Sequence, residues 1–203
     1  MKKALVLLVM VCAVGSVQAQ DFVKGGNYIH IGYGLDPWGH PGVGNAFGTY
    51  KKSVIGPVMV GYEVGVTDVL GIGRIGAGGV LAQSWYTQKY SSGNTESIYR
   101  TSRFSIIPRA TYHFEFDIPK MDVYAGVGAA IHIIGQKDRV YNPLYGNPFF
   151  PGEPEYIESS SSTLRVGHYV FGGIRYYFTD AFAVYAEAGH GVSAINGGVV
   201  FAF

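Results

Sequence analysis

Three arginines and two glutamates are the residues of this sequence best suited to form an ion-pair or acid–base site. They are Glu63, Arg74, Arg109, Arg175 and Glu187. Each lies in a stretch where apolar residues alternate with small or polar ones, on the parity opposite to the apolar face. An arginine beside a glutamate keeps the carboxylate ionised, which suits a structural ion network better than catalysis. We therefore predict a buried Arg/Glu cluster with no catalytic residue, and a polar permeation path is the alternative.

A nucleophilic site is the second chemistry that the sequence suggests. A catalytic reading would make Glu187 the base, His190 the residue that orients it and Ser193 the nucleophile. Glu187 and His190 have opposite parity, however, so in a strand their side chains leave opposite faces. Lipid-deacylating barrels place the serine two residues after the histidine, whereas here the spacing is three. We expect no enzyme, and a lipid-modifying barrel enzyme remains an alternative.

Metal, cofactor and nucleic-acid binding are not expected. His30, His113 and His132 share the inward parity, but His113 and His132 would lie roughly 20–25 Å apart along the wall. The only cysteine, Cys12, lies in a segment that we expect to be removed. Without that segment the Lys and Arg residues fall from 15 to 13 against 14 acidic residues, a net charge of −1. This balance gives no argument for nucleic-acid binding.

The elements that must position these residues are strands, because period-two alternation recurs and no helical period is sustained. Eight segments of about ten residues show it: 27–35, 56–66, 73–86, 103–114, 122–134, 166–178, 182–191 and 197–203. This length matches a tilted strand that crosses a bilayer. The sequence therefore predicts an all-β fold, an eight-stranded antiparallel up-and-down transmembrane β-barrel.

The connections between these segments alternate in length. Those at 67–70, 115–121 and 179–181 are short, whereas those at 36–52, 88–97 and 136–162 are long and rich in polar residues, Gly or Pro. Short turns at one end and long loops at the other are typical of outer-membrane barrels.

The short turns also predict which residues lie opposite one another. They place Glu63 opposite Arg74, Arg175 opposite Tyr185, Arg109 opposite Gly128, and His113 opposite Tyr124. All of these side chains would point inward at similar heights above the turns. We expect Tyr124 and Tyr185 to be hydrogen-bond partners of the ion cluster, because three Arg exceed two Glu by one charge.

The first nineteen residues are predicted to be a secretory signal. Lys2 and Lys3 precede an apolar run of about eleven residues, which is too short to span a membrane. Cleavage is expected between Ala19 and Gln20, leaving one barrel domain over 20–203. With 48% apolar, 15% aromatic and only 14% charged residues, the full sequence is poor in charge for a soluble protein.

These features together resemble the small OmpA/OmpX-like outer-membrane β-barrels, in particular the stretches "PRATYHF" with "DVYAGVGAAI", "FGGIRYYFTDAFAVYAEAGHG" and the final "GGVVFAF". In that family a terminal aromatic and the apolar residues at alternate positions before it form the signal that the barrel-assembly machinery recognises. Val199, Phe201 and Phe203 match that pattern. The resemblance implies the bacterial outer membrane as location, its lipid and the assembly machinery as partners, and no cofactor.

The expected function is therefore that of an integral outer-membrane protein with a structural or surface-interaction role. Its extracellular loops, above all 136–162 with its several aromatic residues, would contact an external ligand or surface. A small gated channel remains an alternative. So does a secreted soluble barrel that binds an apolar ligand, in which the apolar faces would point inward.

Overall fold

The computed structural model describes residues 22–35, 49–92, 95–116 and 118–203. The predicted signal 1–19, its cleavage site at Ala19 and Gln20, and most of the connection 36–52 lie outside these residues. Within the described part, no helix is long and apolar enough to cross a membrane.

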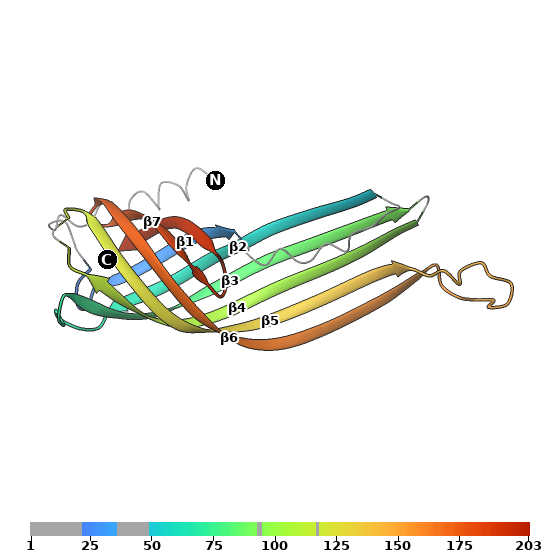
Figure 1. Cartoon of the computed structure of the whole chain (residues 1–203), viewed down its shortest axis with the longest axis horizontal. Coiled ribbons are helices and arrows are strands. Elements are labelled where there is room, and N and C mark those ends of the chain that lie inside the picture. The colour runs from blue at the N-terminus through green and yellow to red at the C-terminus, as the bar shows by residue number, and fades with distance from the viewer. Residues whose placement is uncertain (1–21, 36–48, 93–94, 117) are drawn as a thin grey trace, which may run out of the picture.

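Eight antiparallel strands form a closed barrel in chain order, each paired with the next and β8 paired with β1. They are β1 Asn27–Leu35, β2 Thr49–Gly65, β3 Gly73–Ser92, β4 Thr95–Phe114, β5 Met121–Tyr141, β6 Tyr156–Thr179, β7 Phe182–His190 and β8 Ile195–Ala202 (Figure 1). The predicted eight-stranded, antiparallel, up-and-down barrel is confirmed. Closure leaves no strand edge in the barrel wall, so the wall satisfies its own backbone hydrogen bonds.

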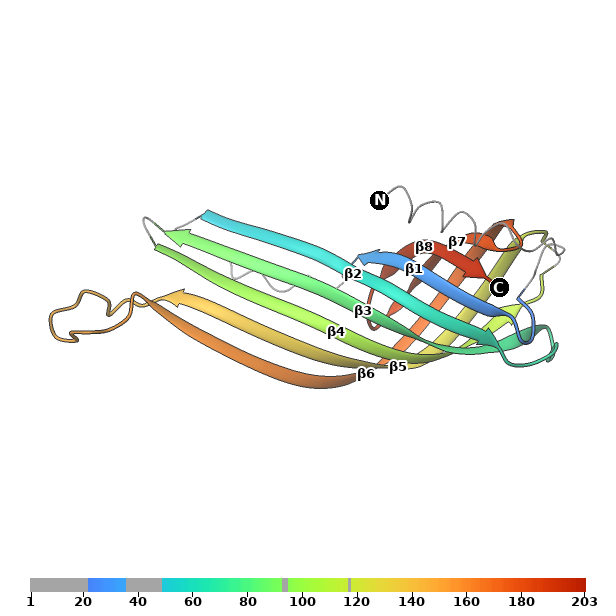
Figure 2. The same cartoon turned by 180° about the vertical axis from the view of Figure 1, so that it is seen from behind.

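The strands differ greatly in length. β1, β7 and β8 have 9, 9 and 8 residues, whereas β2 to β6 have 17 to 24. The last pair with β1 is Tyr33 with Val58, and the last with β7 is His190 with Val170. Beyond these pairs β2 to β6 continue as an open five-stranded sheet, with β2 and β6 as its edges (Figure 2). We call residues 49–55, 85–92, 95–102, 135–141 and 156–162 the projecting sheet.

The predicted strand ends are wrong in this part of the molecule. The connection expected at 136–162 is strand up to Tyr141 and again from Tyr156, and most of the connection expected at 88–97 belongs to β3 and β4. Most described side chains of the projecting sheet are exposed or half-buried, although Tyr86, Gln88 and Ser97 are buried, so apolar and polar residues need not alternate as regularly as in the barrel wall. A strand of this kind is invisible to a search for period two.

Alternation does decide which side chains enter the barrel. In β6 the odd positions from Tyr169 to Tyr177 lie inside, whereas the even positions are exposed. Outside the wall the apolar residues form a continuous belt, which includes Ile31, Val60, Leu81, Ile106, Val127, Val166, Ile174 and Val184. The interior combines buried charges with an apolar cluster that includes Met59 and Ile107, whereas the exterior carries an apolar belt that a water-soluble barrel would not expose.

The predicted opposite pairs are partly confirmed. Arg175 lies opposite Tyr185, Arg109 opposite Gly128, and His113 opposite Tyr124. The pairing of Glu63 with Arg74 is wrong, because Glu63 lies opposite Gly78. The tight turn is at 70–73, closed by a Leu70 N to Gly73 O hydrogen bond of 2.6 Å, and not at 67–70 as expected. Gly71 has a positive φ of 69°, which glycine adopts without strain.

Candidate functional site in the barrel lumen

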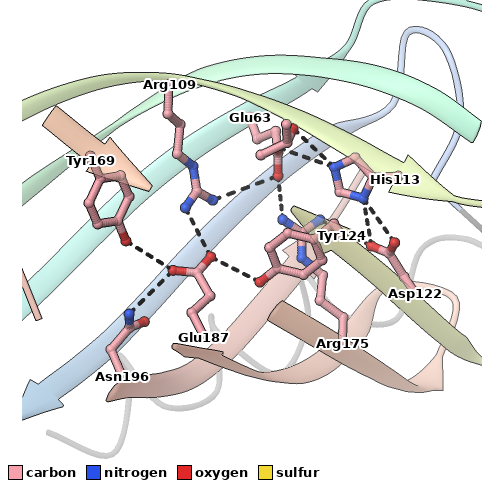
Figure 3. A network of polar contacts seen from close by, with 10 residues as sticks. Glu63, Arg109, His113, Asp122, Tyr124, Tyr169, Arg175, Glu187 and Asn196 are labelled. Carbon is pink, nitrogen blue, oxygen red and sulfur yellow. Dashed lines mark hydrogen bonds and ion pairs between the residues drawn. The ribbon is translucent and has the colours of Figure 1, made fainter. Parts of the chain in front are cut away.

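Four of the five predicted charged residues meet inside the closed part of the barrel. Glu63 from β2, Arg109 from β4, Arg175 from β6 and Glu187 from β7 are each 5% exposed or less. Figure 3 shows them pointing toward one another across the lumen. Of their four strands only β6 and β7 are sequence neighbours, and the contacts of Glu63 and Arg109 with them reach across the lumen of the closed barrel.

Glu63 is the centre of one half of this cluster. Its Oε2 accepts a hydrogen bond from Arg175 Nη2 and lies 3.8 Å from Arg109 Nη2. Its Oε1 accepts a hydrogen bond from Thr111 Oγ1 and lies 3.3 Å from His113 Nε2. A buried carboxylate with this many donors is stabilised as the anion.

Glu187 is the centre of the other half. Arg109 Nη1 and the hydroxyl of Tyr124 each donate to Oε1 at 2.9 Å. Tyr169 and Asn196 approach Oε2, each at 3.3 Å. Arg109 therefore bridges the two glutamates, and one of the two predicted tyrosine partners, Tyr124, lies in the network.

Asp122 and His113 extend the network toward the short-turn end of the barrel. His113 Nδ1 lies 2.9 Å from Asp122, and Arg175 Nη1 lies 3.6 Å from the same carboxylate. Both ring nitrogens of His113 lie within 3.3 Å of a carboxylate oxygen, so the ring links Asp122 to Glu63.

Asp122 was missed by the sequence analysis, and its parity could have revealed it. It lies two residues before Tyr124, on the same inward face, and is 6% exposed. Thr111, Tyr169 and Asn196 were missed for a different reason. Each is an ordinary polar residue at an inward position, and only the distances show that it touches a charge.

Arg74 and Tyr185 are not in the network. Arg74 pairs with Glu115 at 2.7 Å and donates to the carbonyl oxygen of Phe22, near the short-turn end. The four-residue error in the β2–β3 turn explains its misplacement. Tyr185 is buried, but its hydroxyl makes no hydrogen bond with the described residues, and its ring meets His30 edge-on.

Phe22 covers the cluster at the short-turn end. Its ring stacks on His113 with centroids 3.5 Å apart and on Tyr28 at 4.8 Å, and it is 3% exposed. The cluster is therefore packed from the side walls and from one end.

Space for the large side chains comes from inward glycines. A Cβ on Gly173 would lie 2.6 Å from the Tyr124 ring and 2.9 Å from Glu187 Cγ. On the next residue, Gly172, which faces outward, a Cβ would meet nothing closer than 3.8 Å. Because neighbouring residues of a strand face opposite sides, the inward position 173 requires glycine, whereas the outward position 172 has space for a side chain.

The histidine and serine candidates for catalysis do not form a site. Ser193 is buried and its hydroxyl lies 2.7 Å from the carbonyl of Leu35, whereas His190 is exposed and stacks on His168. His132 contacts Ser105, and His30 is buried beside Tyr185. Among the described residues, no group of three or more His, Asp or Glu is placed to hold a metal ion.

Taken together, the contacts suit structure better than turnover. Each carboxylate is engaged by at least two donors, and each arginine reaches two carboxylates. Breaking such a buried pair by removing one partner typically costs about 3–5 kcal/mol.

No protein-family model matches this chain, and a search of curated proteins finds no match. Among solved structures the chain is similar to the N-terminal β-barrel domain of OprF from Pseudomonas aeruginosa, with 14% identity and a TM-score of 0.41 over 89% of this chain and 98% of that one. It is also similar to Ail, the attachment invasion locus protein of Yersinia pestis, in complex with the heparin analogue sucrose octasulfate, with 12% identity and a TM-score of 0.44 over 89% and 96% of the two chains. At these values the likeness assigns no function.

Proposed function

We propose that this chain is an integral protein of the bacterial outer membrane, with a structural or surface-contact role and no enzymatic activity. The observation that carries this proposal is the charge distribution across the wall. Along the outward positions of 58–64, 73–85, 104–114, 123–133, 164–178, 182–190 and 195–201, no Lys, Arg, Asp or Glu occurs. An exterior of this kind is suited to hydrocarbon.

Aromatic residues support the same placement. At the short-turn end the outward rings of Tyr112, Phe114, Tyr176, Phe178, Phe182 and Phe201 pack against their neighbours. Aromatic girdles flank the apolar band of outer-membrane barrels. The short-turn end would then face the periplasm and the projecting sheet the outside.

The terminal strand fits a role in assembly. Val199 and Phe201 share the outward face of β8, and Phe203 is 70% exposed just beyond it. We propose that these three residues are read by the barrel-assembly machinery while β8 is still an unpaired edge. The membrane lipid is the second partner, against the apolar belt.

The projecting sheet is the proposed surface for external contacts. The backbone of 49–55 in β2 and of 156–162 in β6 has no strand partner on its outer side within the described residues. Such an edge can pair with an extended segment of another protein. The connection at 142–155 lies at its tip, farthest from the barrel (Figure 1).

The membrane assignment is tested by cell fractionation with a heat-modifiability gel. We expect the chain in the washed outer-membrane fraction, with an unboiled band that migrates differently from the boiled one. Recovery of a soluble form from the periplasm would overturn the assignment and favour the soluble barrel.

A small channel is the second candidate, because several buried polar atoms lack a protein partner. They include both ring nitrogens of His30, Arg109 Nε and the hydroxyl of Tyr177. Water bound to such atoms could connect into a path. We propose instead that the ion cluster closes the lumen, so planar-bilayer recordings should show no steady conductance. Conductance that rises when Glu187 is replaced by Ala would identify a closed channel.

A further inference from the structure

The outer face of the projecting sheet carries a set of cations immediately beyond the apolar belt. Outward positions there hold Lys51, Lys89, Arg100, Lys137 and Arg139, against Glu96 and Glu158. The two acids are engaged, Glu96 with Lys89 at 3.4 Å and Glu158 with Arg139 at 3.9 Å. Lys51, Arg100 and Lys137 make no ion pair with the described residues.

Two like-charged pairs lie directly opposite each other in the ladder. Lys51 faces Lys89, and Arg100 faces Lys137. Like charges directly opposite destabilise a sheet. The row through Arg100 and Lys137 continues through Thr87 to Ser53 on one side and ends in Ser160 on the other, so none of its positions holds an acid that could relieve the repulsion. An anion from outside the chain would relieve the repulsion between Arg100 and Lys137.

A groove is present at this place. It has a volume of about 660 Å³ and is lined mainly by outward residues, among them Trp85, Arg100, Ser102, Gly135, Lys137 and Ser160. Gly135 has no side chain and leaves the floor of the groove open between its neighbours. A second hollow of about 420 Å³ shares Arg100, Lys137 and Ser160 and continues toward Arg139, where Asp138 and Glu158 also line it.

The position of the groove relative to the apolar belt identifies its occupant. Trp85, Ser102, Gly135 and Ser162 form one row of the sheet, and the outward row next nearer the barrel holds Phe104, Ile133 and Leu164. Arg100 and Lys137 are two residues beyond the row of Trp85, roughly 7 Å further along their strands. A tryptophan at this level is typical of a membrane interface.

We propose that this groove binds the phosphorylated headgroup of an outer-leaflet lipid, whose acyl chains lie along Phe104, Ile133 and Leu164. This inference rests on the proposed membrane location. The Arg100 guanidinium would hold a phosphate by two hydrogen bonds, Lys137 would add a point charge, and the serine hydroxyls would donate to the remaining oxygens. The phosphate removes the repulsion within the Arg100–Lys137 pair.

The test uses the full chain folded into lipid nanodiscs with bisphosphorylated lipid A, or with its dephosphorylated form. Lipid that stays on the protein after detergent extraction is counted by native mass spectrometry. We expect retention of the phosphorylated form only, and a loss of roughly tenfold or more in R100Q/K137Q, because two charge-assisted contacts disappear. The matched control is K52Q/R165Q, which removes the same charges from the opposite face of the same sheet, and it should retain lipid within about twofold of the parent.

Three results would overturn the inference. They are equal retention of dephosphorylated lipid, unchanged retention in R100Q/K137Q, and displacement of the lipid by millimolar inorganic phosphate, which would indicate a site for free anions. A heat-modifiable band is recorded for every sample. If that band is absent from the parent chain, the proposed membrane barrel has failed and not the lipid site alone.

Discussion

Strands β2 to β6 run through both the closed barrel and the projecting sheet, yet charged side chains are accommodated in opposite ways in the two regions. In the barrel, the side chains of Glu63, Arg109, Arg175 and Glu187 are buried and form ion pairs with one another. In the projecting sheet, pairs such as Arg139 with Glu158 are more than half exposed. A charge inside a closed wall must find a partner from the chain, whereas a charge on the open sheet can be solvated or bind a ligand.

The largest expected effect contrasts one ion pair from each region. Replacing Arg175 by Met removes the nearest arginine of Glu63 and the arginine beside Asp122, which should cost about 3–5 kcal/mol of folding free energy. Replacing Arg139 by Met breaks an exposed pair and should cost about 0–1 kcal/mol. Urea unfolding in vesicles, followed by gel mobility, measures both. Equal losses would mean that burial does not separate the two regions.

The outward faces give the next largest contrast. Val127 is 59% exposed in the middle of the apolar belt, and replacing it with Arg should cost about 2–4 kcal/mol in a bilayer. Ser53, outward in the projecting sheet and opposite Thr87, should tolerate Arg with a change of about 0.5 kcal/mol or less. The same unfolding assay applies. A belt position that accepts Arg without loss would contradict the hydrocarbon environment.

A third comparison is made inside the barrel wall itself, between two adjacent glycines. Gly173→Val should cost about 1–3 kcal/mol or more, because its side chain would overlap Tyr124 and Glu187. Gly172→Val faces outward with space and should be nearly neutral. Unfolding midpoints of the two variants, measured side by side, check the alternation. A reversed order would mean that the inward and outward faces have been exchanged.

The smallest effect is expected at the exposed pair of Asp68 and Lys24 at the short-turn end. The hydrogen bond and the charge of Lys24 hold the pKa of Asp68 below its ordinary value. A lowered folded-state pKa contributes stability above the unfolded pKa, and this is lost as pH falls through the folded value. Both groups are solvated, so Asp68→Asn should leave the urea midpoint between pH 3 and 6 within error. A clear pH-dependent shift would show a stronger coupling.

The sequence alone could predict the barrel and much of its interior. Arg175 and Tyr185 were paired correctly because the β6–β7 turn is so short that it fixes the register. Glu63 and Arg74 were mispaired because seven residues, 66–72, join β2 to β3, and the choice of turn within them moved the register by four residues. A connection that can place its tight turn at more than one position does not by itself fix the register of the strands that it joins.

The rest could not be predicted, for physical reasons that differ by region. Most described side chains of the projecting strands are exposed or half-buried, so the alternation that marks the barrel wall is weak there. The contacts of Thr111 and Asn196 with the glutamates depend on how strands from different parts of the chain face each other across the lumen. The spacing of residues within one strand does not predict such contacts.

The connection between β5 and β6 has one practical consequence. Its base is closed by a hydrogen bond of 2.9 Å from Asn142 N to Glu155 O, and its tip has glycines at 146 and 152 with positive φ. In the orientation proposed above, foreign peptides inserted between those glycines would be held clear of the cell surface on a pair of paired strands, while the ladder beneath stayed intact. The protein would then serve as a scaffold for displaying epitopes to antibodies.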